Sequence, residues 1–283
     1  MPIPILLVAA ALAVPVPAAP VFAAPPAAVP ASSRTAAPRD TTVDVGGWRL
    51  RLDVRRGAGP LTILLEAGGG ADGSSWNPVI GTLAERTGAT VVAYDRSGFG
   101  VSDLGAPDLT PRDEIAAVRR ALATIGAPPV MLVVGHSYGA LLAMLHASLH
   151  PEDVVGLVLV DPMNPRFVET TGEFVYSTVT KPPAPSNDFE RAIVRLIRGF
   201  PALIAGLAPV EPALPQPIAI LTAGTGWWDA RHGVTGMDAA WRASHEAMAA
   251  VPGRRLIVVE GARHDVAEAR PDAIVEAVMG ILP

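Results

Sequence analysis

The chain has 283 residues, a formal net charge of −5 and no cysteine, and half of its residues are hydrophobic. The lack of cysteine excludes disulfides, thiolate catalysis and cysteine-based metal sites. The acidic balance and the absence of a basic patch argue against a nucleic-acid partner. A chain of this length can bury enough apolar surface to fold as one domain with an insertion.

The N-terminal 38 residues are nearly all Ala, Val, Pro, Leu and Ile. Residues 3–14 have the length of a signal-peptide core, and small residues around Ala23 are typical of a cleavage site. Prolines at 15, 17 and 20 interrupt the run before the roughly 20 apolar residues of a membrane span. We expect a signal peptide over 1–23, a Pro/Ala-rich linker over 24–41, and a secreted or cell-envelope protein. No basic residue precedes the apolar core, so a cytoplasmic chain with a disordered arm is the alternative.

Apolar runs of strand length alternate with helical patterns from there to the C-terminus. The expected strands are 61–65, 90–94, 130–134, 154–160, 217–222 and 255–259. The expected helices are 76–86, 110–125, 140–147, 237–250 and 271–282. This alternation predicts an α/β fold with a mostly parallel sheet and helices on both faces.

Two loops after early strands have distinctive composition. The first strand leads into Glu66-Ala67-Gly68-Gly69-Gly70, where glycines allow backbone N–H groups to surround a negative charge. The second leads into Asp95-Arg96-Ser97-Gly98-Phe99-Gly100-Val101-Ser102.

The most informative motif is Gly135-His136-Ser137-Tyr138-Gly139, between a predicted strand and a predicted helix. Gly-x-Ser-x-Gly in this context is a nucleophile elbow, a turn too tight for a Cβ at either glycine. It holds the serine at a strained backbone angle with its hydroxyl exposed above the sheet.

The strand after the elbow helix ends at Asp161, and the next strand leads to Asp229. The last predicted strand leads to His264, the one histidine that directly follows a late strand. Because reacting groups gather at the carboxyl ends of parallel strands, His264 is the predicted base. His146 and His150, four residues apart, could pair on a metal, but we predict a plain helix face and no metal site.

Residues 162–216 are too long for an ordinary connection between strands. An amphipathic pattern runs from Phe189 to Leu207. We expect a helical lid here that shapes an apolar pocket.

Together these motifs resemble the α/β-hydrolase family over residues 43 to 283. The matches are the Glu66–Gly70 loop in place of the commoner His-Gly, the Asp95–Ser102 segment, the elbow, and Gly261 three residues before His264, in the family's order. The resemblance implies an α/β-hydrolase domain over 42–283 with the lid as an insertion.

The same resemblance implies a catalytic triad in the order Ser, Asp, His. Ser137 is then the nucleophile and His264 the base, with Asp161 as the acid and Asp229 as the alternative acid. Asp265 is a third, weaker candidate. The oxyanion hole is expected from the backbone N–H of Tyr138 and that of Gly69, with Gly68 or Gly70 as alternatives to Gly69.

The expected function is hydrolysis of a carboxylic ester or similar acyl bond in a small molecule, without a cofactor. Amidase, C–C bond hydrolase or metal-free haloperoxidase-like activity would use the same residues. A non-catalytic ligand-binding protein on a hydrolase fold is the alternative of another class. The oligomeric state does not follow from the sequence.

Overall fold

The computed structural model describes residues 39–179 and 184–282. The predicted signal peptide over 1–23 lies outside the described residues, as does the predicted linker up to residue 38. The first strand begins at Arg39, so the end of the predicted linker range belongs to the sheet.

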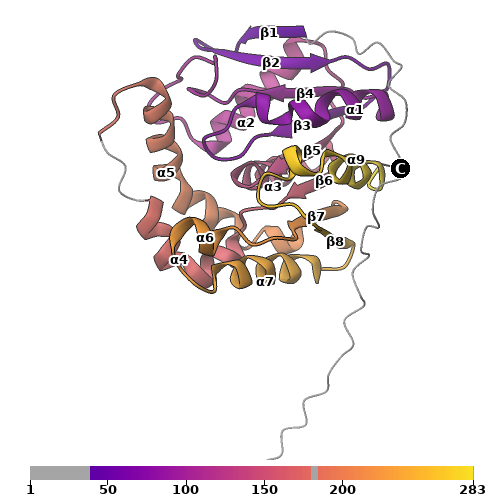
Figure 1. Cartoon of the computed structure of the whole chain (residues 1–283). Coiled ribbons are helices and arrows are strands. Elements are labelled where there is room, and N and C mark those ends of the chain that lie inside the picture. Colours follow the sequence, from indigo (N-terminus) through magenta and orange to yellow (C-terminus); the bar gives the residue numbers. More distant parts are fainter. Residues whose placement is uncertain (1–38, 180–183, 283) are drawn as a thin grey trace, which may run out of the picture.

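An eight-stranded sheet forms the centre of the molecule, in the order β1-β2-β4-β3-β5-β6-β7-β8 (Figure 1). From β4 to β8 all neighbouring strands are parallel, whereas β1 and β2 add an antiparallel edge. The strands are β1 (Arg39–Asp44), β2 (Arg49–Arg55), β3 (Thr62–Glu66), β4 (Thr90–Tyr94), β5 (Met131–His136), β6 (Val154–Val160), β7 (Ile218–Ala223) and β8 (Arg254–Val259). The mostly parallel sheet is confirmed, but the antiparallel edge was not predicted.

Helices cover both faces of the sheet, as predicted, and each face has its own apolar core. One core includes side chains of α2, α3, α4, α5 and α7, and the other includes those of α1, α8 and α9. The helices are α1 (Asn77–Thr87), α2 (Pro111–Thr124), α3 (Tyr138–Leu149), α4 (Pro165–Val179), α5 (Asp188–Leu207), α6 (Trp228–His232), α7 (Met237–Ala249), α8 (Val266–Ala269) and α9 (Pro271–Met279), with short 3₁₀ turns at Gly73–Trp76 and Glu211–Ala213.

Local sequence explains the character of β3 and the start of α2. The strand β3 is buried along its whole length, which accounts for the apolar residues at its centre. At the start of α2, Thr110 and Asp113 form a reciprocal capping box, and Pro111 occupies the first turn, where it has no N–H to lose.

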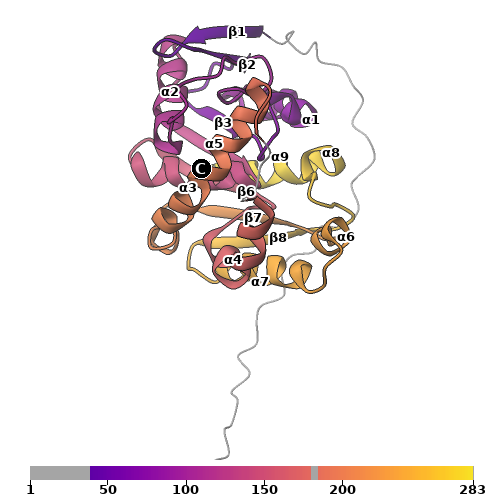
Figure 2. The same ribbon diagram turned by 90° about the vertical axis from the view of Figure 1, so that its left-hand side faces the viewer.

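The insertion at 162–216 contains α4 and α5, with residues 180–183 outside the described part. Its amphipathic pattern is explained by α5, which buries Phe200, Leu203, Ile204 and Leu207. Figure 2 shows α4 and α5 in front of the sheet, on the side that lies at the left in Figure 1. Among the described residues, no helix combines the length and apolar character needed to cross a membrane.

Candidate active site

The turn at Ser137 joins β5 to α3 and has the geometry of a nucleophile elbow. The backbone of Ser137 lies at φ 51° and ψ −117°, in a region that a non-glycine residue rarely occupies. A Cβ on Gly135 would lie 2.5 Å from the Gly139 carbonyl oxygen, and one on Gly139 only 2.2 Å from that of Glu66. Both glycines are therefore required by close approach of backbone.

The imidazole of His264 lies directly beside the hydroxyl of Ser137. Their Nε2 and Oγ atoms are 3.0 Å apart, a hydrogen-bond distance in which the hydroxyl donates if Nε2 is unprotonated. The residues are 127 positions apart in the chain. Parallel strands β5 and β8 bring them together because both residues follow carboxyl ends at the same edge of the sheet.

Asp161 is the carboxylate that holds His264. Its Oδ2 accepts a hydrogen bond from His264 Nδ1 at 2.7 Å, and its Oδ1 accepts bonds from the Ala223 N–H and the Trp241 indole N–H, both at 3.0 Å. Asp161 itself sits at a positive φ of 41°, directly after β6.

The carboxyl of Asp161 is fully buried, and burial alone would raise its pKa. The hydrogen bond from His264, the charges of His245 and His264, and the Ala223 N–H outweigh that effect and lower the pKa to about 2. Asp161 is therefore ionised at neutral pH and acts as a fixed acceptor for His264.

The alternative acid, Asp229, is not brought to His264. Its carboxylate accepts hydrogen bonds from the backbone N–H groups of Gly236 and Met237, at 2.9 and 2.8 Å, at the start of α7. This aspartate caps a helix. Asp265 follows His264 and precedes α8, and His264 is bonded to Asp161 instead.

The predicted oxyanion-hole residues line the same cavity as Ser137 and His264. Gly68, Gly69 and Tyr138 all contribute to its wall. Tyr138 is the first residue of α3, and the first N–H groups of a helix have no partner within the helix. The glycine loop passes close to this helix start, because a Cβ on Gly69 would lie 3.4 Å from the Tyr138 Cβ.

Several residues around His264 were not singled out from the sequence. Trp227 stacks on the imidazole of His264 at a centroid distance of 4.0 Å, and Trp241 donates to Asp161. Neither position follows a recognisable motif, so only the fold reveals their roles. The structure places Trp227 in the wall of the same cavity as Ser137 and His264.

His136 also contributes to the site, which its place inside the elbow motif did not indicate. It lies 2.9 Å from the backbone carbonyl oxygen of His264 through its Nε2, which donates there when protonated. Burial, and next the charge of His264, lowers the pKa of His136 to about 4. His136 is therefore neutral at pH 7, and its contact with the His264 carbonyl ties the elbow to the loop that carries His264.

The cavity in front of Ser137 has a volume of about 440 Å³ and a largely apolar wall. Side chains of the insertion form much of it. They are Met163, Val175, Leu196, Ile197 and Phe200. The residues Trp228, Arg231 and His232 of α6 contribute on another side. A cavity of this size suits a small organic ligand.

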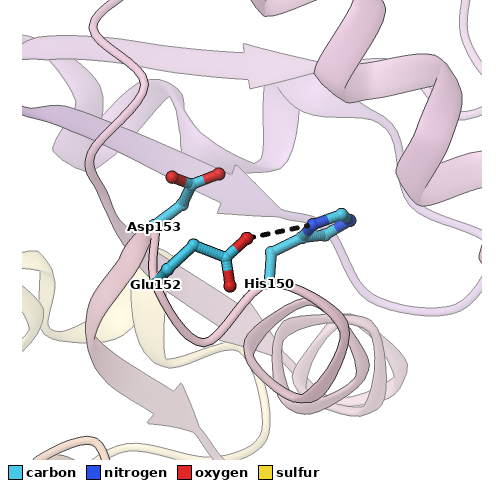
Figure 3. Close-up of side chains that lie close together, drawn as sticks. All are labelled: His150, Glu152 and Asp153. Carbon is cyan, nitrogen blue, oxygen red and sulfur yellow. Dashed lines mark ion pairs between the residues drawn. The ribbon is translucent and has the colours of Figure 1, made fainter.

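A second cluster of polar side chains lies at the far end of α3, where the chain turns into β6. Figure 3 shows His150, Glu152 and Asp153 together, with ligand atoms within 4.8 Å of one another. His146, four residues before His150 on α3, is not part of this group. Arg119 forms an ion pair with Asp153 at 2.5 Å, and His150 lies 3.8 Å from Glu152, so basic side chains already face both carboxylates.

Comparison with known proteins places the chain among relatives of one family. A model of the alpha/beta hydrolase family matches residues 63–277. YqjL of Bacillus subtilis is 30% identical over 123 residues, which are 44% of this chain and 48% of YqjL. Lipase LipV of Mycobacterium tuberculosis is 35% identical over 105 residues, which are 37% of this chain and 38% of LipV. The chain thus spans about half the length of these curated relatives, or less.

A similar fold is present in the enol-lactonase from Burkholderia xenovorans LB400. Its crystal structure superimposes with a TM-score of 0.64 and 17% identity, and the match covers 85% of this chain and 99% of that one. The family model spans most of the domain, including the glycine loop, the elbow and His264. The chain therefore belongs to the alpha/beta hydrolase family.

Proposed function

We propose that this protein is a serine hydrolase that cleaves carboxylic esters through an acyl-enzyme on Ser137. The observation that carries the proposal is the continuous hydrogen-bonded chain from Ser137 Oγ through His264 to Asp161, which opens on an apolar cavity. A serine hydroxyl is a weak nucleophile until such a base accepts its proton.

In the first half-reaction, Ser137 Oγ attacks the ester carbonyl carbon while its proton passes to His264 Nε2. The imidazolium that forms is stabilised by Asp161, which remains ionised because its pKa is about 2. The carbonyl oxygen becomes an oxyanion and accepts hydrogen bonds from the backbone N–H groups of Tyr138 and Gly69. Each such donor contributes about 2.7–4 kcal/mol to the stability of the transition state.

His264 then gives its proton to the alkoxide leaving group, and the C–O bond breaks. In the second half-reaction the same imidazole removes a proton from water, and the resulting hydroxide attacks the acyl carbon. Collapse of the second tetrahedral intermediate releases the acid and returns the proton to Ser137.

The ester class is supported by the apolar cavity wall and by similarity to LipV, which is named a lipase. In this proposal α4 and α5 act as the lid, because Val175 of α4 and Leu196, Ile197 and Phe200 of α5 line the cavity in front of Ser137. The substrate is then an ester with an acyl or alkyl part small enough for about 440 Å³. Amidase, C–C bond hydrolase and metal-free haloperoxidase-like activities would use the same triad, so panels of substrates are needed to separate these activities from ester hydrolysis.

The test combines covalent labelling with turnover. A fluorophosphonate should form one adduct per chain, located on Ser137 by mass spectrometry, and the Ser137→Ala variant should not be labelled. A panel of p-nitrophenyl esters of graded acyl length, beside matching anilides, should show ester turnover that Ser137→Ala abolishes. Specific ligand binding without labelling or turnover would identify a binding protein instead.

A further inference from the structure

Arg96 is a fully buried cation beneath the glycine loop, outside the Ser137–His264–Asp161 chain. Its guanidinium donates to two consecutive backbone carbonyl oxygens, from Nη1 to Ala67 and from Nη2 to Gly68, each at 2.5 Å. Only 2% of Arg96 is exposed. A buried arginine is costly unless its donors are used, and here both Nη groups hold a loop rather than a carboxylate, whereas Nε has no hydrogen-bond partner.

The direction of these carbonyls determines the direction of the neighbouring N–H groups. A trans peptide is planar, so its C=O and N–H bonds point in opposite directions. The Gly68 carbonyl and the Gly69 N–H belong to one peptide unit, and the Ala67 carbonyl and the Gly68 N–H belong to the previous one. By holding both carbonyls, Arg96 turns both N–H groups away from itself.

Without such an anchor this loop would have other conformations available, because its glycines tolerate a wide range of backbone angles. Gly70 has a positive φ of 79°, and the Gly68 carbonyl accepts a further bond from the Ala71 N–H at 3.2 Å. The loop is therefore a tight turn, and Arg96 bonds it on the side where the carbonyls face.

The same guanidinium also contacts the other half of the oxyanion hole. Its central carbon lies 5.5 Å from the ring centroid of Tyr138. Behind it lies the buried Glu66, whose Oε2 accepts a hydrogen bond from the Tyr94 hydroxyl at 2.8 Å. Burial raises the pKa of Glu66 to about 7, and the charge of Arg96 opposes that rise. Arg96 thus lies against both segments that we expect to supply the N–H groups of the oxyanion hole.

We propose that Arg96 is a positioning residue that sets the direction of the Gly69 N–H and its distance from the Tyr138 N–H, and so assembles the oxyanion hole. This inference rests on the proposed serine hydrolase function. Arginine suits the task because its planar, forked guanidinium bonds two acceptors at once. A lysine ammonium is a single point charge on a flexible stem and cannot hold both carbonyls in one orientation.

The test compares Arg96→Lys and Arg96→Met with the wild type in ester hydrolysis and in fluorophosphonate labelling. A displaced oxyanion donor acts on the transition state, so kcat should fall by about 10²-fold with KM nearly unchanged. The rate of phosphonylation should fall by a similar factor, because the phosphonyl oxygen uses the same N–H groups. Millimolar ethylguanidinium should restore part of the activity of Arg96→Ala but not of Ser137→Ala.

Arg254 offers a matched control. It is also a buried arginine, with bonds to Glu211 and to the Met248 carbonyl, but it lies at the start of β8, away from the carboxyl ends of the strands. Arg254→Met should lower the melting temperature while kcat per folded molecule stays close to that of the wild type.

The outcomes separate the positioning role from the function itself. Wild-type kcat and labelling in folded Arg96→Lys would overturn the positioning role, as would a loss confined to KM. If Arg96→Met does not fold, Arg96→Lys decides, because its ammonium retains the buried charge. A wild-type enzyme without labelling or turnover would instead refute the serine hydrolase function, whatever the Arg96 variants do.

Discussion

Replacing Asp161 by asparagine tests which aspartate acts with His264. The two oxygens of Asp161 have different partners, so the orientation of the new amide is determined. The position of Oδ1 receives two N–H donors, from Ala223 and Trp241, and must remain an acceptor. The amide oxygen of the introduced asparagine therefore takes that position, and its NH₂ group faces His264.

An NH₂ group in the place of Oδ2 forces His264 Nδ1 to become an acceptor, because its present partner lies only 2.7 Å away. The imidazole proton then moves to Nε2, the atom that should accept the proton of Ser137. A base in the wrong tautomer costs about 10⁴ in kcat, or about 5.4 kcal/mol of transition-state stabilisation. The loss of volume is negligible, so the fold should persist.

The assay is hydrolysis of a p-nitrophenyl ester by Asp161→Asn and Asp229→Asn under the same conditions. Asp229→Asn is the matched control, because asparagine caps a helix nearly as well as aspartate and kcat should remain near that of the wild type. A large fall for Asp229→Asn together with near-normal turnover for Asp161→Asn would refute the assignment of Asp161 as the acid.

Three further changes test other parts of the site. Gly139→Ala places a Cβ 2.2 Å from the Glu66 carbonyl oxygen. Urea denaturation should therefore show a free energy of unfolding lower by about 1–3 kcal/mol. An unchanged free energy of unfolding would contradict the close approach. Burial lowers the pKa of His136 to about 4, so as the pH falls below about 6.5 the imidazole is protonated in the unfolded state before it is protonated in the folded state. Between pH 7 and pH 4 the free energy of unfolding of the wild type should therefore fall by up to about 3 kcal/mol more than that of His136→Asn. Equal falls in the two proteins would argue against a buried neutral imidazole. Trp241→Phe keeps the packing but removes the indole N–H that donates to Asp161. A hydrogen bond to a charged group contributes about 1.5 kcal/mol, so its loss should reduce kcat roughly tenfold. An unchanged kcat would show that this bond does not orient the carboxylate.

The parallel part of the sheet was predictable because β3, β4, β5 and β7 are almost wholly buried and consist mainly of apolar residues. The strands β1 and β2 escaped prediction for the complementary reason. They form the antiparallel edge, where β2 places buried apolar residues between three more accessible arginines and also includes an aspartate. Such short, charged segments have no distinctive pattern until they pair with neighbours.

The turn around Ser137 could be recognised in the sequence because its backbone geometry requires particular residues. The elbow needs glycine on both sides of Ser137, so its sequence is recognisable without a fold. The choice between Asp161 and Asp229 stayed open because the local sequence after a strand does not show whether an aspartate accepts bonds from a helix start or from a histidine. The contacts of Arg96 were hidden for a related reason, since a linear motif does not indicate which carbonyls a guanidinium will reach.

The sequence alone therefore established the alternation of parallel strands and helices and the turn at Ser137, because both depend on periodicity and steric limits within a few residues. Only the tertiary structure decided that Asp161 rather than Asp229 is hydrogen-bonded to His264, and that Trp241 and the Ala223 N–H donate to the same carboxylate. It also decided that Arg96 donates to the carbonyls of the glycine loop. Those contacts join segments tens of residues apart, and the packing of parallel strands and helices, not local preference, determines which side chains meet.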